Sequence, residues 1–153
     1  MTTRKTTDQR FIDLCREAAN GWSTCQREAV GAVVARGGEI VKPGWNGAPS
    51  GQPHCIDVGC LMDDGHCIRA IHAEDNALWY AGREACNGAT LYVSHFPCWR
   101  CAQVIVRAGI ARVVYEQEYR VDERARRLLY SSCSLERFVD GKAKMVKILE
   151  EVS

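Results

Sequence analysis

No segment of this 153-residue sequence approaches the run of about 20 apolar residues that a membrane-spanning helix requires. A charge excess is also missing, because 20 lysines and arginines face 19 aspartates and glutamates, giving a formal net charge of +1. Proteins that bind nucleic acid usually carry a basic face, so this balance argues against that class. The basic N-terminal residues are followed by no apolar stretch, so we expect no signal peptide and a cytoplasmic location.

Cysteine, in contrast, is abundant, with nine residues in the chain. An odd number of cysteines, two of them in a Cys-x-x-Cys motif, does not suggest the disulfide framework of a small secreted protein. Metal binding in a reducing cytoplasm explains more of them. The length suits one domain with a real hydrophobic core, so we expect residues 1–153 to form a single domain.

Helical and strand patterns alternate along the chain. Apolar residues recur at helical spacing over residues 8–19, and the run Val30–Ala35 is typical of a buried strand. A turn at Gly37–Gly38 leads to a second strand over 39–42, and a long loop follows over about 43–69. Beyond the loop, the pattern predicts helices over 72–81, 98–108 and 122–130 and strands over 90–94 and 111–115. This alternation predicts an α/β layered domain with a mixed sheet.

Two short motifs carry the chemistry. His72 and Glu74 lie where a helix is expected to begin, and Cys98 and Cys101 lie in the segment Pro-Cys-Trp-Arg-Cys. Pro97 suits the first position of a helix, so both cysteines are expected in its first turn with their sulfurs on one face. One imidazole and two thiolates make three zinc ligands and leave a fourth position open for water, as in catalytic zinc sites. A lone Cys-x-x-Cys would fit a closed zinc knuckle or a buried cysteine pair, but the added histidine and glutamate argue against both.

The order His-x-Glu, then Pro-Cys-x-x-Cys, is similar to the signature of zinc-dependent deaminases. In such a site, zinc lowers the pKa of its water ligand towards about 7 and creates hydroxide. Glu74 is not a ligand, and we expect it to take the proton of the water and deliver it to the ring nitrogen and the departing amine. The attack falls on carbon 4 of a cytosine ring, and ammonia leaves.

The resemblance extends from about Cys25 to Tyr119. The chain resembles the deoxycytidylate (dCMP) deaminases of the cytidine deaminase superfamily, and the matching stretches include Val30–Val33, Gly44–Gly51, Ile71–Glu74, Gly88–Val93 and Phe96–Cys98. The Gly-x-Asn-Gly-x-Pro loop narrows the resemblance to the mononucleotide branch, although Trp45 stands where that branch usually has tyrosine. The resemblance implies a three-layer cytidine-deaminase-like fold, in which helices flank a central mixed five-stranded sheet.

The resemblance also implies substrate contacts outside the zinc motifs. Asn46 would contact the sugar hydroxyl, and the backbone around Ala73 and Ser94 would read the edge of the pyrimidine. Arg27 and Tyr119 would contact the nucleotide or its phosphate. Simpler interpretations stay open, because Asn46 could be a turn residue in a left-handed conformation and Arg27 a surface arginine.

Control by nucleotides and self-association are further implications of the resemblance. Family members use the loop that matches Gly44, Trp45, Asn46 and Gly47 to bind dCTP with Mg²⁺, and dTTP inhibits them. They form hexamers or dimers through the region of the helix that carries Trp79 and Tyr80, so we expect a homo-oligomer. Core packing of these two aromatic residues is the alternative.

The remaining cysteines suggest a second metal site. Cys55, Cys60 and Cys67 crowd a loop too long to be an idle connection, and Cys25 lies just before the first strand. Soft thiolates in a loop without a core of its own suit a structural zinc, and the resemblance implies such a site with cysteines matching Cys25 and Cys55. We predict a closed four-sulfur site from these four cysteines, with His54 and His66 as reserve ligands. Buried free cysteines are the alternative.

The preferred function is hydrolytic deamination of dCMP to dUMP and ammonia, which supplies dUMP for thymidylate synthesis. A deaminase of another substrate, such as a modified deoxynucleotide, a free nucleoside or tRNA, is the nearest rival. The near-neutral charge disfavours nucleic acid, which would need a basic, aromatic-lined approach to the zinc. A non-catalytic, zinc-stabilised nucleotide sensor is a further alternative, and the intact motif residues argue against it.

Overall fold

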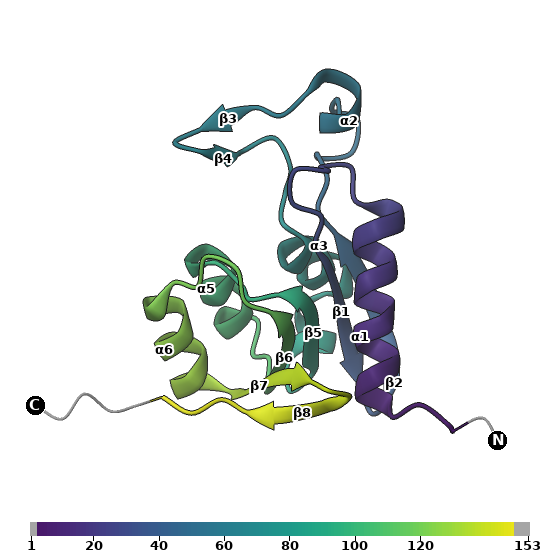
Figure 1. Ribbon diagram of the computed structural model, residues 1–153, viewed down its shortest axis with the longest axis vertical. Helices are drawn as coiled ribbons and strands as arrows, with labels where there is room; N and C mark the ends of the chain where they lie inside the picture. Colours follow the sequence, from purple (N-terminus) through teal and green to yellow (C-terminus); the bar gives the residue numbers. More distant parts are fainter. Residues whose placement is uncertain (1–2, 149–153) are drawn as a thin grey trace, which may run out of the picture.

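A mixed sheet forms the centre of the protein, as a computed structural model of residues 3–148 shows (Figure 1). Its strands follow the spatial order β2-β1-β5-β6-β7-β8. The central strands β5, β6 and β7 run parallel, whereas β2, β1 and β8 pair antiparallel with their neighbours. The strands are β1 (Gly31–Arg36), β2 (Glu39–Trp45), β5 (Thr90–His95), β6 (Arg112–Gln117), β7 (Ser134–Val139) and β8 (Lys142–Met145).

Helices cover both faces of this sheet. On one face, α1 (Thr7–Glu17) packs Phe11, Ile12 and Cys15 against alternate residues of the central strands, and a π-helical turn, η1 (Ala18–Trp22), extends it. The other face is covered by α3 (Ala73–Ala81), α5 (Trp99–Arg107) and α6 (Glu123–Ser132), and a short helix α4 (Arg83–Cys86) follows α3. Because both faces are covered, β1 is buried along almost its whole length, which explains its continuous apolar run.

The expected three-layer α/β architecture with a mixed sheet is therefore confirmed. Among the described residues the sheet has six strands rather than the expected five, because β7 and β8 form a hairpin at its edge. Their half-exposed positions carry charged residues, so they lack the apolar run that identifies a buried strand. The expected domain limits of 1–153 include residues 1–2 and 149–153, which lie outside the described residues.

The long loop predicted over about 43–69 contains short elements of its own, and we call residues 46–71 the cysteine-rich layer. It contains a one-turn helix, α2 (Cys55–Val58), and a two-stranded ribbon of β3 (Met62–Asp63) and β4 (His66–Cys67). Figure 1 shows this part, at the top of the view, projecting beyond the sheet. Across residues 3–148, no helix has the length and apolar character needed to cross a membrane.

A polar cluster ties the first helix to three strands. Arg112 on β6 donates two hydrogen bonds of 3.0 Å to the carboxylate of Asp8 on α1, and two more, of 2.5 and 3.0 Å, to Glu136 on β7. Tyr92 on β5 donates a hydrogen bond of 2.5 Å to Asp8. The bonds from Arg112 lower the pKa of Asp8 below its usual value of 3.8, although partial burial opposes this effect.

We predict that Asp8→Asn lowers the free energy of unfolding at pH 7 by about 1 kcal/mol, because Arg112 and Tyr92 lose a charged partner. A carboxylate with a depressed pKa stabilises the fold above its unfolded pKa and loses this effect as the pH falls through the folded pKa. In denaturant titrations, the difference in the free energy of unfolding between wild type and variant should therefore shrink below about pH 4. The control Glu39→Gln removes an exposed carboxylate and should change nothing. A difference that persists at pH 3 would contradict the prediction.

Candidate active site

Two helix N-termini meet at the centre of the site. His72 is the N-terminal cap of α3, and Glu74 is the second residue of that helix. Cys98 is the N-terminal cap of α5, and Cys101 follows in its first turn. The sequence predicted Pro97 at the first position of this helix, but Pro97 lies one residue before the cap. The expected convergence of two helix starts is confirmed.

The three expected metal ligands lie within coordinating reach of one ion. The Nδ1 atom of His72 is 3.5 Å from the Cys98 sulfur and 3.4 Å from the Cys101 sulfur. All three ligand atoms lie within 4.8 Å of one another. One imidazole and two sulfurs at this spacing fit tetrahedral zinc with a fourth position left open. A closed knuckle is not formed here, because a fourth cysteine or histidine is absent from this group of described residues.

The two sulfurs differ in how readily they lose a proton: the bond with Cys98, together with burial, raises the pKa of Cys101. Hydrogen bonds from Cys101 and His72 lower the pKa of Cys98 to about 4, although burial opposes this shift. The bond to Cys98 in turn raises the pKa of His72 to about 9. Two helix N-termini add positive potential from their backbone N–H groups, which further stabilises thiolate. Zinc displaces such protons when it binds, so the cluster is suited to exchange protons for a metal ion.

Glu74 lies beside the metal ligands without joining them. Its carboxyl is 4% exposed, and this burial raises its pKa above the usual value of 4.5. Its Oε2 atom accepts a hydrogen bond of 3.6 Å from the Cys101 sulfur. A carboxyl that holds a proton more readily than usual, next to a metal site, can serve as a proton carrier near neutral pH.

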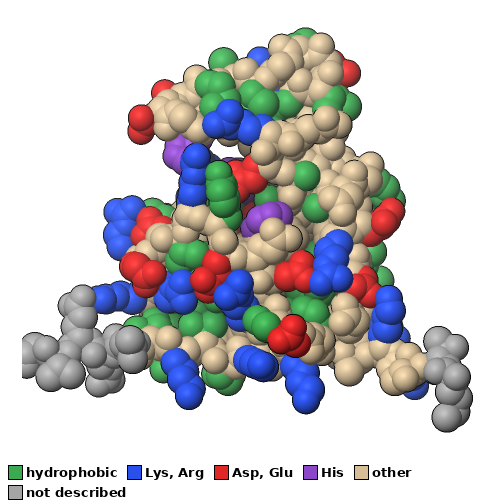
Figure 2. Space-filling model, in the orientation of Figure 1, with side chains coloured by type: hydrophobic (Ala, Val, Ile, Leu, Met, Phe, Trp, Pro, Cys, Tyr) green, Lys and Arg blue, Asp and Glu red, His purple; other side chains and the backbone are tan. Residues whose placement is uncertain are grey.

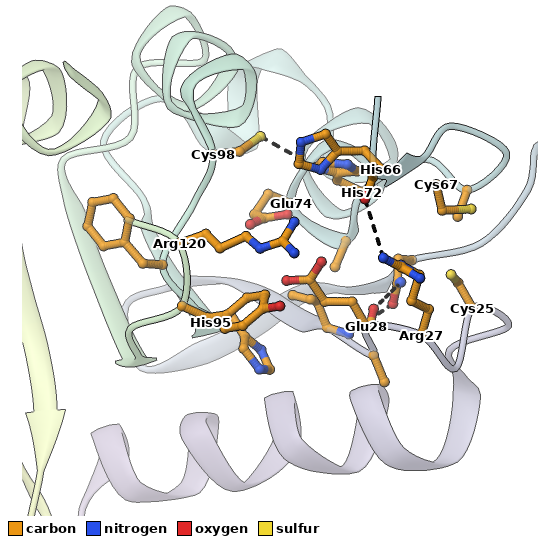
Figure 3. A pocket seen from close by; sticks show the side chains of 18 residues that line it. Cys25, Arg27, Glu28, His66, Cys67, His72, Glu74, His95, Cys98 and Arg120 are labelled. Carbon is orange, nitrogen blue, oxygen red and sulfur yellow. Dashed lines mark hydrogen bonds between the residues drawn. The ribbon is translucent and has the colours of Figure 1, made fainter. Parts of the chain in front are cut away.

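A cavity of about 720 Å³ lies beside these residues (Figure 3), and Figure 2 shows the surface hollowed between the part that projects beyond the sheet and the body of the protein. Its size is within the range of small-molecule sites. One end is lined by His72, Glu74 and Cys98, and the cysteine-rich layer contributes Gly65, His66, Cys67 and Ala70 to the wall. The layer that projects from the sheet is therefore part of the enclosure around the candidate site.

The expected substrate contacts fall into two groups. Asn46, Ala73, Arg27 and Tyr119 line the cavity. Ser94 is absent from the lining: it is buried, and its hydroxyl accepts a hydrogen bond of 3.0 Å from the backbone N–H of Gly31. The next residue along the strand, His95, lines the cavity instead.

Asn46 is held by the protein itself. Its side-chain oxygen accepts hydrogen bonds from the Val30 backbone N–H, at 2.9 Å, and from the Ser23 hydroxyl, at 2.6 Å. Its amide nitrogen donates to the carbonyl of Glu28 at 2.6 Å. Asn46 is not among the residues with positive φ, so the left-handed turn considered as an alternative is not formed. These bonds position the segment that carries Arg27 and Glu28 along the cavity.

The stretch Gly44–Gly47 packs β2 against the start of α3. A β-carbon at Gly44 would lie 2.5 Å from the Ala73 carbonyl oxygen, so only glycine allows the helix to start this close to the strand. The Trp45 ring meets Trp22 edge-on with centroids 4.7 Å apart, and Gly47 pairs with Ile71. Gly44, Trp45 and Gly47 do not line the cavity.

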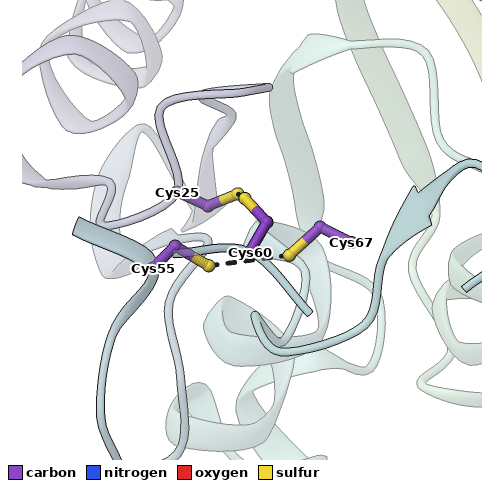
Figure 4. Close-up of side chains that lie close together, drawn as sticks. All are labelled: Cys25, Cys55, Cys60 and Cys67. Atoms are coloured by element: carbon purple, nitrogen blue, oxygen red, sulfur yellow. Dashed lines mark hydrogen bonds between the residues drawn. The ribbon is translucent and has the colours of Figure 1, made fainter. Parts of the chain in front are cut away.

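The second cysteine cluster is assembled as the sequence analysis predicted (Figure 4). The sulfurs of Cys25 and Cys60 are 3.8 Å apart, those of Cys55 and Cys67 are 3.5 Å apart, and all four lie within 4.8 Å of one another. Although burial opposes it, backbone N–H bonds from the chain that follows lower the pKa of Cys67 to about 6. Four sulfurs leave no open position, which is the arrangement of a structural zinc site.

The reserve ligands lie elsewhere. The Nδ1 atom of His54 pairs with the Thr24 hydroxyl at 2.9 Å, and His66 lines the cavity. Neither histidine belongs to the four-cysteine group.

Sequence reasoning missed Glu28, His95 and Arg120, which also line the cavity. These residues come from three separate connections and strand ends, so no local motif marks them. Glu28 and Arg120 could have been found from their neighbours in the sequence, Arg27 and Tyr119, because both of these were expected to contact the nucleotide.

The fold and the two helix-borne motifs define a metalloprotein of the zinc deaminase class. The family profile "Cytidine and deoxycytidylate deaminase zinc-binding region" matches residues 5–117. The chain belongs to this family, and the cluster of His72, Cys98 and Cys101 lies within the matched residues.

Individual relatives agree with this assignment. ComE operon protein 2 of Bacillus subtilis is 43% identical over 108 residues, which cover 69% of this chain but 57% of that protein. The deoxycytidylate deaminase of Mycobacterium phage D29 is 38% identical over 123 residues, or 72% of this chain and 94% of the phage protein. A crystal structure of dCMP deaminase from the cyanophage S-TIM5, in complex with dCMP and dUMP, is similar with a TM-score of 0.72 and 29% identity, and the match covers 90% of this chain and all of that chain.

Proposed function

We propose that the chain forms one zinc-dependent deaminase domain that converts dCMP and water to dUMP and ammonia. The observation that carries the proposal is the cluster of His72, Cys98 and Cys101 with the buried carboxyl of Glu74 beside it, at one end of a cavity of about 720 Å³. The names of the phage relatives, and the nucleotides bound in the cyanophage structure, support dCMP as the substrate. The product would supply dUMP for thymidylate synthesis.

Each residue of the site has a separate role in the proposed reaction. His72, Cys98 and Cys101 would hold the zinc ion, which would lower the pKa of a bound water molecule towards neutrality. Glu74 would carry two protons in turn: the first passes from the water to the pyrimidine ring nitrogen, and the second, released as the new carbonyl forms, passes to the amine, which leaves as ammonia. The backbone of Ala73 lines the cavity beside Glu74, where it can hold the edge of the ring. Asn46 and Tyr119 are assigned to the sugar and the phosphate end.

The proposal is tested by ammonia release from a panel of dCMP, CMP, dCTP, deoxycytidine, guanine and an adenosine-bearing RNA hairpin. We expect dCMP to give the highest kcat/KM. Preference for another compound would overturn the substrate assignment. Absence of release from any of them, in protein that holds zinc, would favour a nucleotide sensor.

Within the same assay, we predict that Glu74→Gln retains the catalytic zinc and loses turnover by at least about 100-fold, because glutamine cannot carry the proton. Metal analysis and initial rates measure the two properties separately. Glu84→Gln, on the exposed side of α4, is the matched control and should keep its rate. Substantial residual turnover in Glu74→Gln would mean that another group carries the proton.

Feedback control by dCTP with Mg²⁺ and by dTTP is part of the proposal. The family resemblance assigns the stretch Gly44–Gly47 to the effector. This stretch includes the end of β2, packs against the start of α3 and carries Asn46 at the cavity wall. An effector bound there would act on both the start of α3 and the nucleotide pocket. In the dCMP assay we expect dCTP with Mg²⁺ to change the rate and dTTP to lower it, and unchanged rates would remove this part of the proposal.

A second, structural zinc at Cys25, Cys55, Cys60 and Cys67 completes the metal content. We predict about two zinc ions per chain in the purified protein, and about one in either Cys60→Ser or Cys98→Ser, because each variant removes a ligand from a different cluster. Elemental analysis per mole of chain is the measurement. Cys133→Ser, whose sulfur bonds the Leu129 carbonyl, is the control and should keep both ions. A wild-type content of one would disprove the second site.

A homo-oligomer, a hexamer or a dimer, is the proposed assembly. The Trp79 side chain on α3 is 79% exposed, and its neighbour Tyr80 is 62% exposed, which disfavours the alternative that they belong to the core. Light scattering should give a mass that is a multiple of the 17.1 kDa chain, and Trp79→Glu should lower it by placing a charge in the contact. Tyr130→Glu, at an exposed position of α6, is the control and should leave the mass unchanged. A wild-type mass of one chain would contradict the proposal.

All nine cysteines are free thiols in the structure. Free thiols and two cysteine-rich metal clusters support the proposed location in a reducing cytoplasm.

A further inference from the structure

The cysteine-rich layer has no apolar core. Apart from Asn46 and Gly47 next to β2, Cys55 is the only buried residue of this layer, all of whose residues the structure describes. Its large aliphatic side chains are exposed instead, and these are Ile56, Val58, Leu61, Met62 and Ile68. A segment that buries so little apolar surface cannot offset the entropy lost when it becomes ordered. The fold of the layer therefore depends on the four-cysteine cluster and on whatever holds its sulfurs together.

Cys60 is the sulfur of this cluster that solvent reaches. It is exposed, whereas Cys25 and Cys55 are buried and Cys67 is half-buried. A sulfur that serves as a zinc ligand is held as the thiolate, which is the nucleophilic form of cysteine. Oxidants attack cysteines that combine thiolate character with exposure. Cys60 is therefore the point at which an oxidant in solution meets the cluster.

A partner for an oxidised Cys60 lies beside it. The sulfurs of Cys25 and Cys60 are 3.8 Å apart, and Figure 4 shows the two side chains directed toward each other. Cys55 and Cys67 form the other close pair, with sulfurs 3.5 Å apart. A disulfide bond is about 2.05 Å long, so a small movement joins the first pair.

Cys98 is also exposed, but its surroundings differ. Its sulfur lies 3.5 Å from Nδ1 of His72 and lines the cavity beside Glu74. A nucleotide in the proposed pocket would cover Cys98. Cys60 is not among the residues that line the cavity, so a bound nucleotide leaves it open to solvent.

We propose that Cys60 is a site of reversible oxidation by peroxide, and that the disulfide it forms with Cys25 opens the four-sulfur site. The inference rests on the proposed second zinc, which these sulfurs would hold. The Cys60 sulfur attacks one oxygen of hydrogen peroxide, the O–O bond breaks, and a sulfenic acid and water result. The Cys25 sulfur then attacks the Cys60 sulfur, the S–O bond breaks, and the oxygen leaves as a second water molecule. Two thiols thereby lose two electrons and two protons, and one peroxide is reduced to two water molecules.

Oxidation would release one wall of the cavity. Cys55 and Cys67 alone do not complete a structural zinc site, which needs four ligands. Cys67 ends β4, and the ribbon of β3 and β4 lines the cavity through Gly65 and His66. Outside the cluster, a hydrogen bond of 3.4 Å from Arg27 to the Gly65 carbonyl joins this ribbon to the body of the protein. The oxidised protein therefore loses the order of this wall and keeps the other cluster.

The first test follows metal and disulfides in the zinc-loaded protein. An equimolar amount of hydrogen peroxide should release about one zinc ion per chain, measured with a colorimetric chelator. Peptide mapping after thiol alkylation should find Cys25 joined to Cys60, and a dithiol reductant with added zinc should restore the metal content. Retention of all the zinc, or a disulfide between Cys98 and Cys101 in place of the expected one, would overturn the proposal.

The variant Cys60→His separates oxidation from metal binding. Imidazole can replace a thiolate as a zinc ligand, so this variant should hold as much zinc as wild type while lacking the exposed sulfur. We expect peroxide to release zinc from it at least about tenfold more slowly. Cys133→Ser, which changes a cysteine outside both clusters, is the control and should release zinc at the wild-type rate. Equal rates in Cys60→His and wild type would contradict the role of Cys60.

Limited proteolysis reports on the layer without any turnover. Arg69 is the only lysine or arginine in residues 46–71, so trypsin cuts the layer after this residue. Cleavage there should be at least about fivefold faster after oxidation, because cleavage follows local opening. Unchanged cleavage in protein that carries the disulfide would overturn the opening of the cavity wall. A protein that deaminates no dCMP, but releases zinc as the disulfide between Cys25 and Cys60 forms, would overturn the proposed function and leave this inference in place.

Discussion

The grouping of the Cys98 and Cys101 sulfurs with the buried carboxyl of Glu74 is the constraint on which the rest of the structure depends. Cys101 is 3% exposed and Glu74 is 4% exposed, and such groups cannot all ionise together unless a cation lies among them. A single ion must also contact His72, so α3 and α5 have to begin side by side. The parallel pair β5–β6 places the start of α5, and the close approach of β2 at Gly44 places the start of α3.

Both groups of candidate metal ligands could be predicted from the sequence, because ligand chemistry restricts the choice of residue. Cys98 and Cys101 are close through helix geometry alone, and His72 and Glu74 share one helix start. The four-cysteine cluster is harder to predict, since Cys25 is separated from Cys55 by two strands. It was predictable because a loop rich in thiols has few other ways to become ordered. The layered fold was predictable for a similar reason, because the buried strands carry continuous apolar runs.

The remaining features depend on contacts that no local pattern records. The hairpin strands β7 and β8 alternate charged and apolar residues over only a few positions, so their sequences do not distinguish them from a helix or a loop. Glu28, His95 and Arg120 reach the cavity only because the sheet order brings three distant connections together. Asn46 was expected at the substrate, and it lines the cavity, but its hydrogen bonds to Val30, Ser23 and Glu28 could not be read from the sequence.

Cys25 and Cys67 belong both to the four-sulfur cluster and to the wall of the cavity. A cation at that cluster and a nucleotide in the cavity, as proposed above, would therefore share part of their surroundings. Thermodynamic linkage between two such sites is reciprocal, so whatever the cation adds to nucleotide affinity, the nucleotide adds to cation affinity. If the coupling is favourable, molecules with a bound nucleotide would then lose this cation last when the metal concentration in the cell falls.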